Sequence, residues 1–345
     1  MDVVRTAIVG MGIGRHNGRG IARNERGRVV ALCDIVEDRM KEFAEELPEP
    51  VTFYTDYKEM CQDPDIDAVF VGTPNQLHVP VALEAVRNGK HVLVTKPLAD
   101  CEEAARELVE TAEASGMVNM MSLSMRFSDE VRYLEQVRDQ GDFGDIYYAR
   151  ARSIRRSGIP DWSPGFIREG GGAFRDMGVH VLDSAWWLLG KPRPISISGI
   201  AGARFGPRGQ GYWDYRPQER RFYEQFAADD FGGGFIRFEE ALGLQIESFW
   251  ASHQPEEVQI ELFGTDAGAQ FRPLTLYRTE HGAPQDIKVD LPEGPNAWDR
   301  IADHFIACIL DDVECEAPLR HGLIIQQMME SLLESAKTGK EIRFD

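Results

Sequence analysis

The first third of the chain alternates short apolar runs with longer amphipathic segments, and this order restricts the fold more than any other feature. The apolar runs predict strands at residues 6–9, 29–33, 51–54, 68–72, 91–95 and 117–123. The segments between them predict helices at residues 13–24, 36–47, 79–88 and 101–115, with Asp56 as the N-cap of a further helix and Gly89 and Gly116 as stops. A strict strand–helix order predicts a parallel sheet covered by helices on both faces.

The pattern changes after about residue 125. Strands are predicted at residues 145–155, 231–238, 243–252, 258–263 and 269–277. Because few helices separate these strands, they indicate an antiparallel sheet. Residues 200–230 are rich in glycine, arginine and aromatic side chains and predict a long excursion, either a lid or a subunit contact. Two amphipathic helices close the chain, one capped by Asn296 and one over residues 318–337 with Gly339 beyond its end.

The length of 345 residues suits two domains, which we predict at residues 1–124 and 125–345, with the last helix free to pack back on the first domain. The 38 basic and 57 acidic residues give a formal net charge of −19. Such an acidic chain repels phosphate backbones and anionic lipids, so nucleic acid and membranes are not expected as partners.

The five cysteines contain no C-x-x-C pair, and no Cys/His group has zinc-motif spacing, so we predict no metal. Scattered thiols of this kind indicate a reducing compartment, and we expect a cytoplasmic protein. No apolar stretch approaches the roughly 18 residues that a membrane helix needs, and the first residues do not resemble a signal peptide.

A glycine-rich turn follows the first predicted strand. Gly10 ends the strand, Gly12 allows a pyrophosphate to approach the backbone, and the following helix presents free N–H groups to it. In the usual G-x-G-x-x-G motif the third glycine comes one residue later than Gly14, and Arg15 takes that place here. The turn, with Ile13 between the last two glycines, predicts a dinucleotide-binding site.

Asp34 ends the second predicted strand. A carboxylate at this position can accept hydrogen bonds from both ribose hydroxyls of an adenosine, and it would repel a 2′-phosphate. Ile35 adds no positive charge to offset that repulsion. The residue therefore favours NAD over NADP, and the alternative interpretation is that Asp34 caps the next helix.

Three further side chains are candidates for chemistry. Lys96 follows the strand at residues 91–95, at the edge of the sheet where ligands bind, and could stabilise a developing alkoxide. Asp176 and His180 lie four residues apart on one face of a predicted helix, and a histidine is a suitable general base for a hydroxyl proton. The plainer alternatives are an exposed lysine and an ordinary helix contact.

Several motifs occur along the chain in one order: the glycine turn, Asp34, Thr73-Pro74-Asn75 with His78, Lys96-Pro97, and a glycine run followed by Asp176 and His180. This order resembles that of the glucose–fructose oxidoreductase/inositol dehydrogenase (Gfo/Idh/MocA) family over nearly the whole chain. The resemblance implies an α/β fold with an N-terminal Rossmann domain and a second α/β domain built on a large open antiparallel sheet. It also implies an enzyme that oxidises or reduces a secondary alcohol of a sugar or cyclic polyol, and contacts between subunits in a homodimer or homotetramer.

The resemblance also assigns roles to residues. It implies that Lys96, Asp176 and His180 are catalytic, and that Thr73-Pro74-Asn75 contacts the nicotinamide ribose with His78 nearby. The family usually has Glu-Lys-Pro, whereas this chain has Thr95 before the lysine. The expected NAD contacts are Gly10, Gly12, Ile13, Gly14, Arg15, Asp34, Thr73, Pro74, Asn75, His78, Thr95 and Lys96. The expected substrate contacts are Lys96, Arg126, Trp162, Arg168, Asp176 and His180, although Trp162 and Arg168 could equally serve packing and surface roles.

In the reaction we expect, His180 accepts the proton of a ring hydroxyl, Lys96 stabilises the alkoxide, and Asp176 positions the substrate or the imidazole. The hydride passes to C4 of NAD⁺. Two alternatives stay open: a glycosidase or lyase that holds NAD and oxidises its sugar only transiently, and a protein that senses NAD(H) without catalysis.

Overall fold

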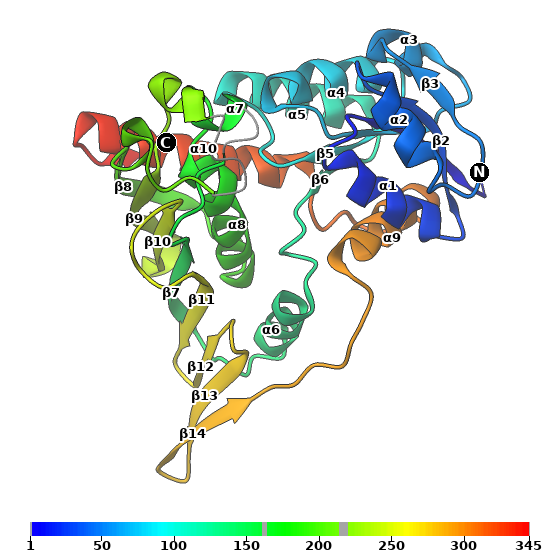
Figure 1. The fold of residues 1–345 in the computed structure, drawn as a ribbon. Coiled ribbons are helices and arrows are strands. Elements are labelled where there is room, and N and C mark those ends of the chain that lie inside the picture. The colour runs from blue at the N-terminus through cyan, green and yellow to red at the C-terminus, as the bar shows by residue number, and fades with distance from the viewer. Residues whose placement is uncertain (1, 161–163, 214–219, 345) are drawn as a thin grey trace. The chain divides into compact units, whose positions relative to one another are not determined.

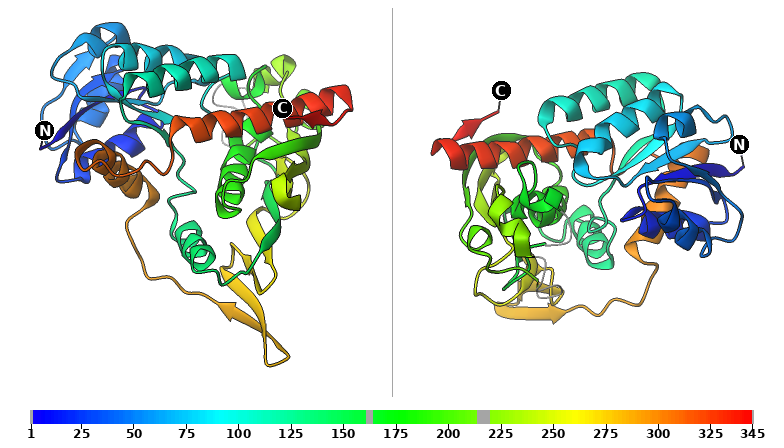
Figure 2. Two further views of the ribbon diagram at one scale, coloured as in Figure 1. Left: turned by 180° about the vertical axis from the view of Figure 1, so that it is seen from behind. Right: turned by 45° about the horizontal axis from the view of Figure 1, so that its top comes forward.

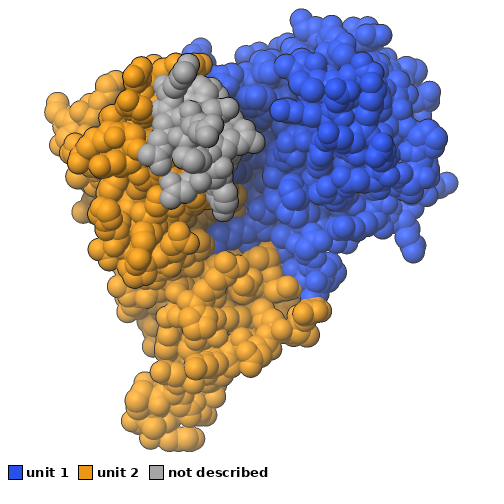
Figure 3. Space-filling view, viewed as in Figure 1, with its two compact units in different colours: residues 1–127, 294–326 blue, residues 128–293, 327–345 orange. Residues whose placement is uncertain are grey.

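The structure is a computed structural model that describes residues 2–160, 164–213 and 220–344 (Figure 1). The chain divides into two compact units, which Figure 3 colours separately. Unit 1 comprises residues 1–127 and 294–326, and unit 2 comprises residues 128–293 and 327–345. Neither unit is therefore one continuous stretch of sequence.

Unit 1 contains a six-stranded sheet in the order β3-β2-β1-β4-β5-β6, and all neighbouring strands pair in parallel. The strands are β1 (Val4–Val9), β2 (Gly27–Cys33), β3 (Thr52–Tyr54), β4 (Ala68–Val71), β5 (His91–Thr95) and β6 (Asn119–Ser122). The predicted doubly wound parallel sheet is confirmed. Its strand order reverses direction between β1 and β4, which is where ligands bind in sheets of this class.

Helices connect these strands as the sequence predicts. They are α1 (Gly14–Arg23), α2 (Glu37–Ala44), α3 (Tyr57–Gln62), α4 (His78–Arg87) and α5 (Glu102–Ser115), with a 3₁₀ turn, η1, at Asn75–Leu77. A further helix of unit 1, α9 (Ala297–Leu310), comes from a later part of the chain. Helices α4 and α5 lie side by side on one face of the sheet, and α1 and α9 lie against each other on the other (Figure 2). Asp56 and Asn296 accept hydrogen bonds from the first turns of α3 and α9, so both predicted N-caps are confirmed.

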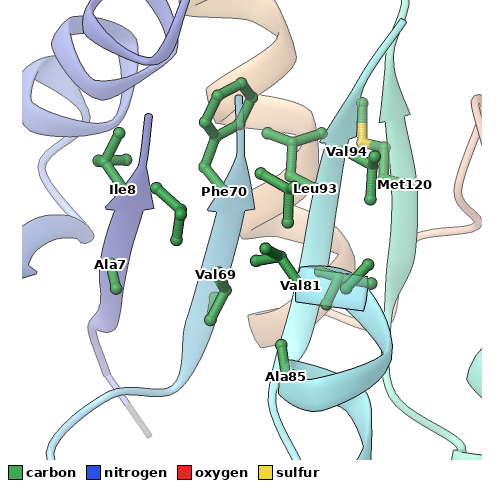
Figure 4. Packing of buried hydrophobic residues seen from close by; sticks show 14 of the residues in the cluster. Ala7, Ile8, Val69, Phe70, Val81, Ala85, Leu93, Val94 and Met120 are labelled. Atoms are coloured by element: carbon green, nitrogen blue, oxygen red, sulfur yellow. The ribbon is translucent and has the colours of Figure 1, made fainter. Parts of the chain in front are cut away.

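The core of unit 1 fills the space between the sheet and these helices (Figure 4). Ile8, Phe70 and Leu93, on three neighbouring strands, are fully buried, and Val81 and Ala85 of α4 are buried with them. Burying such side chains is the main favourable contribution to folding, at about 25 cal/mol per Å² of apolar surface. The core fixes the strand ends in place, and the loops that follow them are the candidate ligand-binding loops.

Unit 2 is built on a nine-stranded sheet in the order β14-β13-β12-β11-β7-β10-β9-β8-β15. The strands are β7 (Ile146–Ile154), β8 (Pro194–Gly202), β9 (Phe231–Phe238), β10 (Gly243–Phe249), β11 (Glu257–Gly264), β12 (Ala267–Gln270), β13 (Thr275–Glu280), β14 (Ala283–Lys288) and β15 (Ile342–Arg343). Strands β7 and β10 pair in parallel and the other pairs are antiparallel. The sheet is therefore mixed rather than wholly antiparallel.

The helices of unit 2 are α6 (Asp129–Asp139), α7 (Pro164–Ile167) and α8 (Val179–Leu188), and α8 packs on β7, β10 and β11. A π-helical segment, η2 (Phe174–Gly178), leads directly into α8, and short 3₁₀ turns lie at η3 (Gly206–Arg208), η4 (Arg220–Gln225) and η5 (Glu239–Ala241). Helix α10 (Leu319–Thr338) begins in unit 1 and ends in unit 2. In the part of the chain that the structure describes, no helix is both long and apolar enough to cross a membrane.

The single strand predicted at residues 269–277 is wrong. The structure has a turn at residues 271–274 between β12 and β13, because Pro273 cannot donate a hydrogen bond to a continuing ladder. Strand β8 and helix α6 were not predicted, although Ser128 caps α6 and Val131, Leu134 and Val137 of that helix are buried. In the excursion at residues 200–230, Phe205, Tyr212 and Phe226 pack against the buried Trp250 cluster of unit 2.

Candidate functional site

The glycine turn after β1 has the backbone that a phosphate-binding loop requires. Gly10 has a φ of +87°, and a Cβ atom there would lie 2.5 Å from the carbonyl oxygen of Gly72. Gly14 begins α1, and a Cβ atom there would lie 2.8 Å from a methyl carbon of Ile8. Gly14 therefore allows α1 to pack closely on the sheet, which is the usual role of the third glycine although it comes one residue early.

Asp34 links the glycine turn to the second strand. Its Oδ2 atom accepts a hydrogen bond of 2.8 Å from the backbone N–H of Met11, and Oδ1 accepts one of 2.9 Å from Val36. Helix α2 begins at Glu37 after Val36, without a side-chain cap, so Asp34 is not the N-cap residue of α2. Each carboxylate oxygen retains a lone pair that could accept a ribose hydroxyl.

Arg15 follows the glycine turn, and Ile35 follows Asp34 in the chain. The Arg15 guanidinium forms an ion pair of 2.8 Å with Glu42 and donates to the carbonyl oxygen of Arg39. Ile35 is 90% exposed. The Arg15 side chain is thus held against α2, and the nearest neighbour of Asp34 along the chain offers only apolar surface.

His78 connects the loops that follow β4 and β5. It is fully buried, with Nδ1 lying 2.7 Å from the carbonyl oxygen of Pro97 and Nε2 lying 2.7 Å from that of Thr73. Burial lowers the pKa of His78, whereas the two carbonyl groups oppose that change. An enclosed ring of this kind can affect a cofactor only through the two loops that it joins.

The residues after β4 and β5 fit the nicotinamide half of a dinucleotide. Thr73 Oγ1 is buried and has no hydrogen-bond partner among the described residues, and Gly12 has open space where a side chain would be. Pro74 and Asn75 open the η1 turn beside Thr73. Polar groups with unused hydrogen-bonding capacity at the carboxyl ends of parallel strands match an NAD site.

Thr95 and Lys96 lie where β5 ends. Thr95 is 5% exposed and pairs with Ser122 of β6, and Lys96 is half-buried and joined to Pro97 by a cis peptide bond. Lys96 therefore follows a strand adjacent to β4, at the same edge of the sheet as the glycine turn.

Asp176 and His180 lie on one continuous helical segment of unit 2. Asp176 belongs to the π-helical stretch and His180 to the first turn of α8, which the sequence predicts as a plain α-helix. π-Helical segments within α-helices are frequent at functional sites. Both side chains are partly exposed, as groups that act on a ligand must be.

Two residues that the sequence analysis missed hold the Asp176 carboxylate. The indole N–H of Trp250 donates to its Oδ2 atom over 3.0 Å, and a guanidinium nitrogen of Arg155 lies 4.0 Å from the same oxygen. Burial lowers the pKa of Arg155, and Asp176 opposes this effect. Both residues come from the ends of strands β7 and β10, and the pairing of these strands could not be inferred from local patterns.

A second carboxylate, that of Asp229, forms a hydrogen bond with the backbone of the π-helical segment. The Oδ2 atom of Asp229 accepts a hydrogen bond of 2.9 Å from the backbone N–H of Phe174, two residues before Asp176. Burial raises the pKa of Asp229 to about 6, against the effects of this hydrogen bond and of Arg175. Asp229 thus belongs to the support of the π-helical segment.

The other predicted substrate contacts have different surroundings. Arg126 is fully buried in unit 1, and its guanidinium donates to the carbonyl oxygen of Glu316 over 2.6 Å. Arg168 is exposed and donates to Gln225 over 2.6 Å. Trp162 lies outside the described residues. Arg126 therefore has a packing role in this structure, and its predicted contact with substrate stays a prediction.

The structure thus gathers the predicted cofactor residues at one sheet edge of unit 1 and places Asp176 and His180 together in unit 2. A doubly wound sheet with this loop, this aspartate and this lysine defines an NAD-binding oxidoreductase of the Rossmann class. Two family models match the chain: the oxidoreductase family with an NAD-binding Rossmann fold over residues 4–123, and the GFO/IDH/MocA C-terminal domain over residues 131–270. The protein belongs to the Gfo/Idh/MocA family, as its motifs predict.

Relatives of known sequence extend over most of the chain. D-glucoside 3-dehydrogenase from Escherichia coli K12 is 29% identical, over 98% of this chain and 97% of its own length. The NAD⁺-dependent scyllo-inositol 2-dehydrogenase of Bacillus subtilis 168 is 27% identical, over 76% of this chain and 72% of its own. The solved structure of levoglucosan dehydrogenase in complex with NADH and levoglucosan is 19% identical and shares the fold with a TM-score of 0.83, over 99% of both chains.

Proposed function

We propose that the protein is an NAD-dependent dehydrogenase that transfers hydride between a secondary hydroxyl of a sugar or cyclic polyol and the nicotinamide ring. The observation that carries the proposal is that two sets of residues occur together in one chain. One set is the glycine turn, Asp34 and Lys96 at a single sheet edge, and the other is Asp176 with His180 on one helical segment. The sugar and inositol dehydrogenases among the relatives support the substrate class.

Each residue has a defined task in the proposed reaction. The His180 imidazole accepts the hydroxyl proton as general base, because a neutral histidine is available for this at physiological pH. The Lys96 ammonium donates a hydrogen bond to the developing alkoxide and lowers its energy. Asp176, held by the Trp250 indole, positions the substrate or the imidazole. NAD⁺, when bound, supplies the hydride acceptor, and the reduction of a ketone uses the same groups in reverse.

We also propose that the preferred coenzyme is NAD rather than NADP. A 2′-phosphate on the adenosine ribose would meet the carboxylate of Asp34, and two like charges at hydrogen-bonding distance repel each other strongly. Ile35 cannot offset this repulsion, and the Arg15 guanidinium is already paired with Glu42.

The test is a panel of sugars, glycosides and cyclic polyols followed by NADH absorbance. We expect at least one of them to give net NADH, and we expect His180→Ala to lower kcat by roughly 100-fold or more while the protein still binds NADH. His281→Ala, in the exposed turn between β13 and β14, is the matched control and should leave kcat unchanged. Unchanged turnover in His180→Ala would refute the proposed role of the imidazole.

The same panel separates the alternative functions. Cleavage of a glycoside or loss of water without net NADH would identify a lyase or glycosidase that oxidises its substrate transiently. NADH binding without turnover of any compound would favour a sensor. Product analysis by mass spectrometry alongside the absorbance assay distinguishes these results.

We further propose a cytoplasmic homodimer or homotetramer. All five cysteines are free thiols, which supports a reducing compartment. Phe231, Phe235 and Phe249 are partly exposed on one face of the unit 2 sheet, and Ile200 beside them is 64% exposed. An exposed apolar patch of this kind commonly marks a protein–protein interface. Light scattering should report two or four chains, and a monomer would contradict this proposal.

A further inference from the structure

A compact group of sulfur and nitrogen ligands lies in unit 1, apart from the residues assigned to NAD. His304, Cys308 and Cys315 place one ligand atom each within 4.8 Å of one another. His304 and Cys308 lie four residues apart on α9, so their side chains share one face of the helix. Cys315 comes from the loop between α9 and α10. The spacing H-x₃-C-x₆-C matches no common zinc motif, which is why the sequence alone did not predict the group.

One distance within the group matches that between two ligands of a tetrahedral metal centre. The Sγ atom of Cys308 lies 3.5 Å from Nε2 of His304. A tetrahedral zinc with bonds of about 2.3 Å to sulfur and 2.0–2.1 Å to nitrogen separates these two atoms by about 3.5 Å. The Cys308–His304 pair is therefore already spaced for coordination, and the ligand atom of Cys315 lies within 4.8 Å of both.

The protonation of the group also suits a metal. The backbone N–H of Glu316 donates to His304 Nε2 over 2.9 Å, so this nitrogen carries the lone pair that a metal requires. Metal ligands must be deprotonated, and a thiolate is the form that binds.

We propose that His304, Cys308 and Cys315 bind a zinc ion. Binding expels the two thiol protons, and the ion takes the place of the Glu316 N–H at Nε2. Two thiolates balance the 2+ charge of the ion, which allows the site to lie among the largely buried side chains of unit 1. Thiolate and imidazole ligands together favour zinc over magnesium or calcium, which prefer oxygen.

The location indicates a structural role for this ion. Cys315 contacts the carbonyl oxygen of Asn119, the first residue of the edge strand β6. The proposed cofactor loops instead follow the last residues of β1, β2, β4 and β5. An ion bound by His304, Cys308 and Cys315 would fasten the end of α9 to the loop before α10, beside β6. It would not take part in hydride transfer.

Metal uptake by the reduced, full-length protein tests the proposal directly. The protein is treated with a chelator and a reductant, exchanged into anaerobic buffer, and titrated with Co²⁺, whose spectrum reports its ligands. We expect one Co²⁺ per chain, with a thiolate-to-metal charge-transfer band and the intense visible bands of tetrahedral cobalt, and displacement of the cobalt by Zn²⁺. A spectrum without the charge-transfer band would overturn the proposal, whether or not any variant folds.

Variants assign the ligands. Cys315→Ser, in a loop, should weaken the charge-transfer band, because only the Cys308 thiolate remains, and should weaken metal binding by roughly 100-fold or more, with an unchanged far-ultraviolet circular dichroism spectrum. Cys101→Ser removes an exposed thiol outside the group and should bind Co²⁺ like the unaltered protein. Equal binding by both variants would overturn the proposal. A Cys308–Cys315 disulfide that forms in air, together with no metal uptake after reduction, would also overturn it and identify a thiol pair instead.

Discussion

The Asp229 carboxylate gives a quantitative test of how the candidate catalytic segment is supported. Burial raises the pKa of Asp229 from an ordinary value of 3.8 to about 6. A raised carboxyl pKa means that the folded state binds the proton more tightly than the unfolded state between these two values. The stability contributed by this group is therefore fully present below about pH 4 and is lost as the pH rises through 6.

The shift of about two pKa units corresponds to about 3 kcal/mol at 1.36 kcal/mol per unit. This value is an upper limit, because part of Asp229 remains exposed to solvent. Asp229→Asn removes the ionisation while its amide oxygen can still accept the Phe174 N–H. Burying the added N–H₂ group without an acceptor costs about 1 kcal/mol. We therefore expect the variant to be more stable than the unaltered protein by about 1–2 kcal/mol at pH 7.5, and less stable than it at pH 4.

Urea unfolding followed by tryptophan fluorescence measures this difference, because every tryptophan except Trp298 belongs to unit 2. The unfolding free energy of Asp229→Asn minus that of the unaltered protein should rise between pH 4 and pH 6.5 and stay level above that range. Asp229→Ala should show the same rise but lie lower at every pH, since it leaves the Phe174 N–H without its acceptor. A difference that does not change with pH would refute the reasoning.

Three further substitutions test the site. Gly10→Ala should abolish measurable NADH binding in calorimetry, because its Cβ would lie 2.5 Å from the Gly72 carbonyl oxygen and φ is +87° there; an unchanged Kd would contradict this. Asp34→Ser should narrow the preference for NAD over NADP, measured as the ratio of kcat/KM values, by roughly tenfold or more, and an unaltered ratio would remove the charge argument. Trp250→Phe deletes the N–H that reaches Asp176 over 3.0 Å and should lower kcat about tenfold at constant KM for NAD; a change in KM alone would instead assign Trp250 to coenzyme binding.

The sequence was informative where the determinants are local. The apolar runs of β4 and β5, the caps Asp56 and Asn296, and the glycine stop at Gly116 are set by neighbouring residues, so the parallel sheet and its connections could be predicted. The position of Lys96 at the ligand-binding edge of the sheet could be predicted for the same reason, because it follows a strand whose direction the fold class determines.

Long-range pairing accounts for what could not be predicted. Strands β7 and β10 are far apart in sequence. Their parallel pairing places Arg155, after β7, and Trp250, after β10, close to Asp176. Cys315 approaches His304 and Cys308 because the loop after α9 folds back on that helix, and local sequence patterns do not predict this contact. The π-helical segment at Asp176 packs against β7, β9 and β10, and local sequence patterns did not distinguish it from an α-helix.

The threading of the chain through unit 1 has a consequence for its synthesis. The hydrophobic core of that unit contains Ile301, Phe305 and Ile306 of α9 and Leu323 of α10, which leave the ribosome only after all of residues 128–293. During synthesis, the surface of the first 127 residues that α9 will cover therefore stays exposed to solvent until residues 128–293 have been made. Exposed apolar surface of this kind is a target for chaperones. A truncation that removes α9 and α10 should therefore destabilise the N-terminal sheet as well as the C-terminal part of the protein.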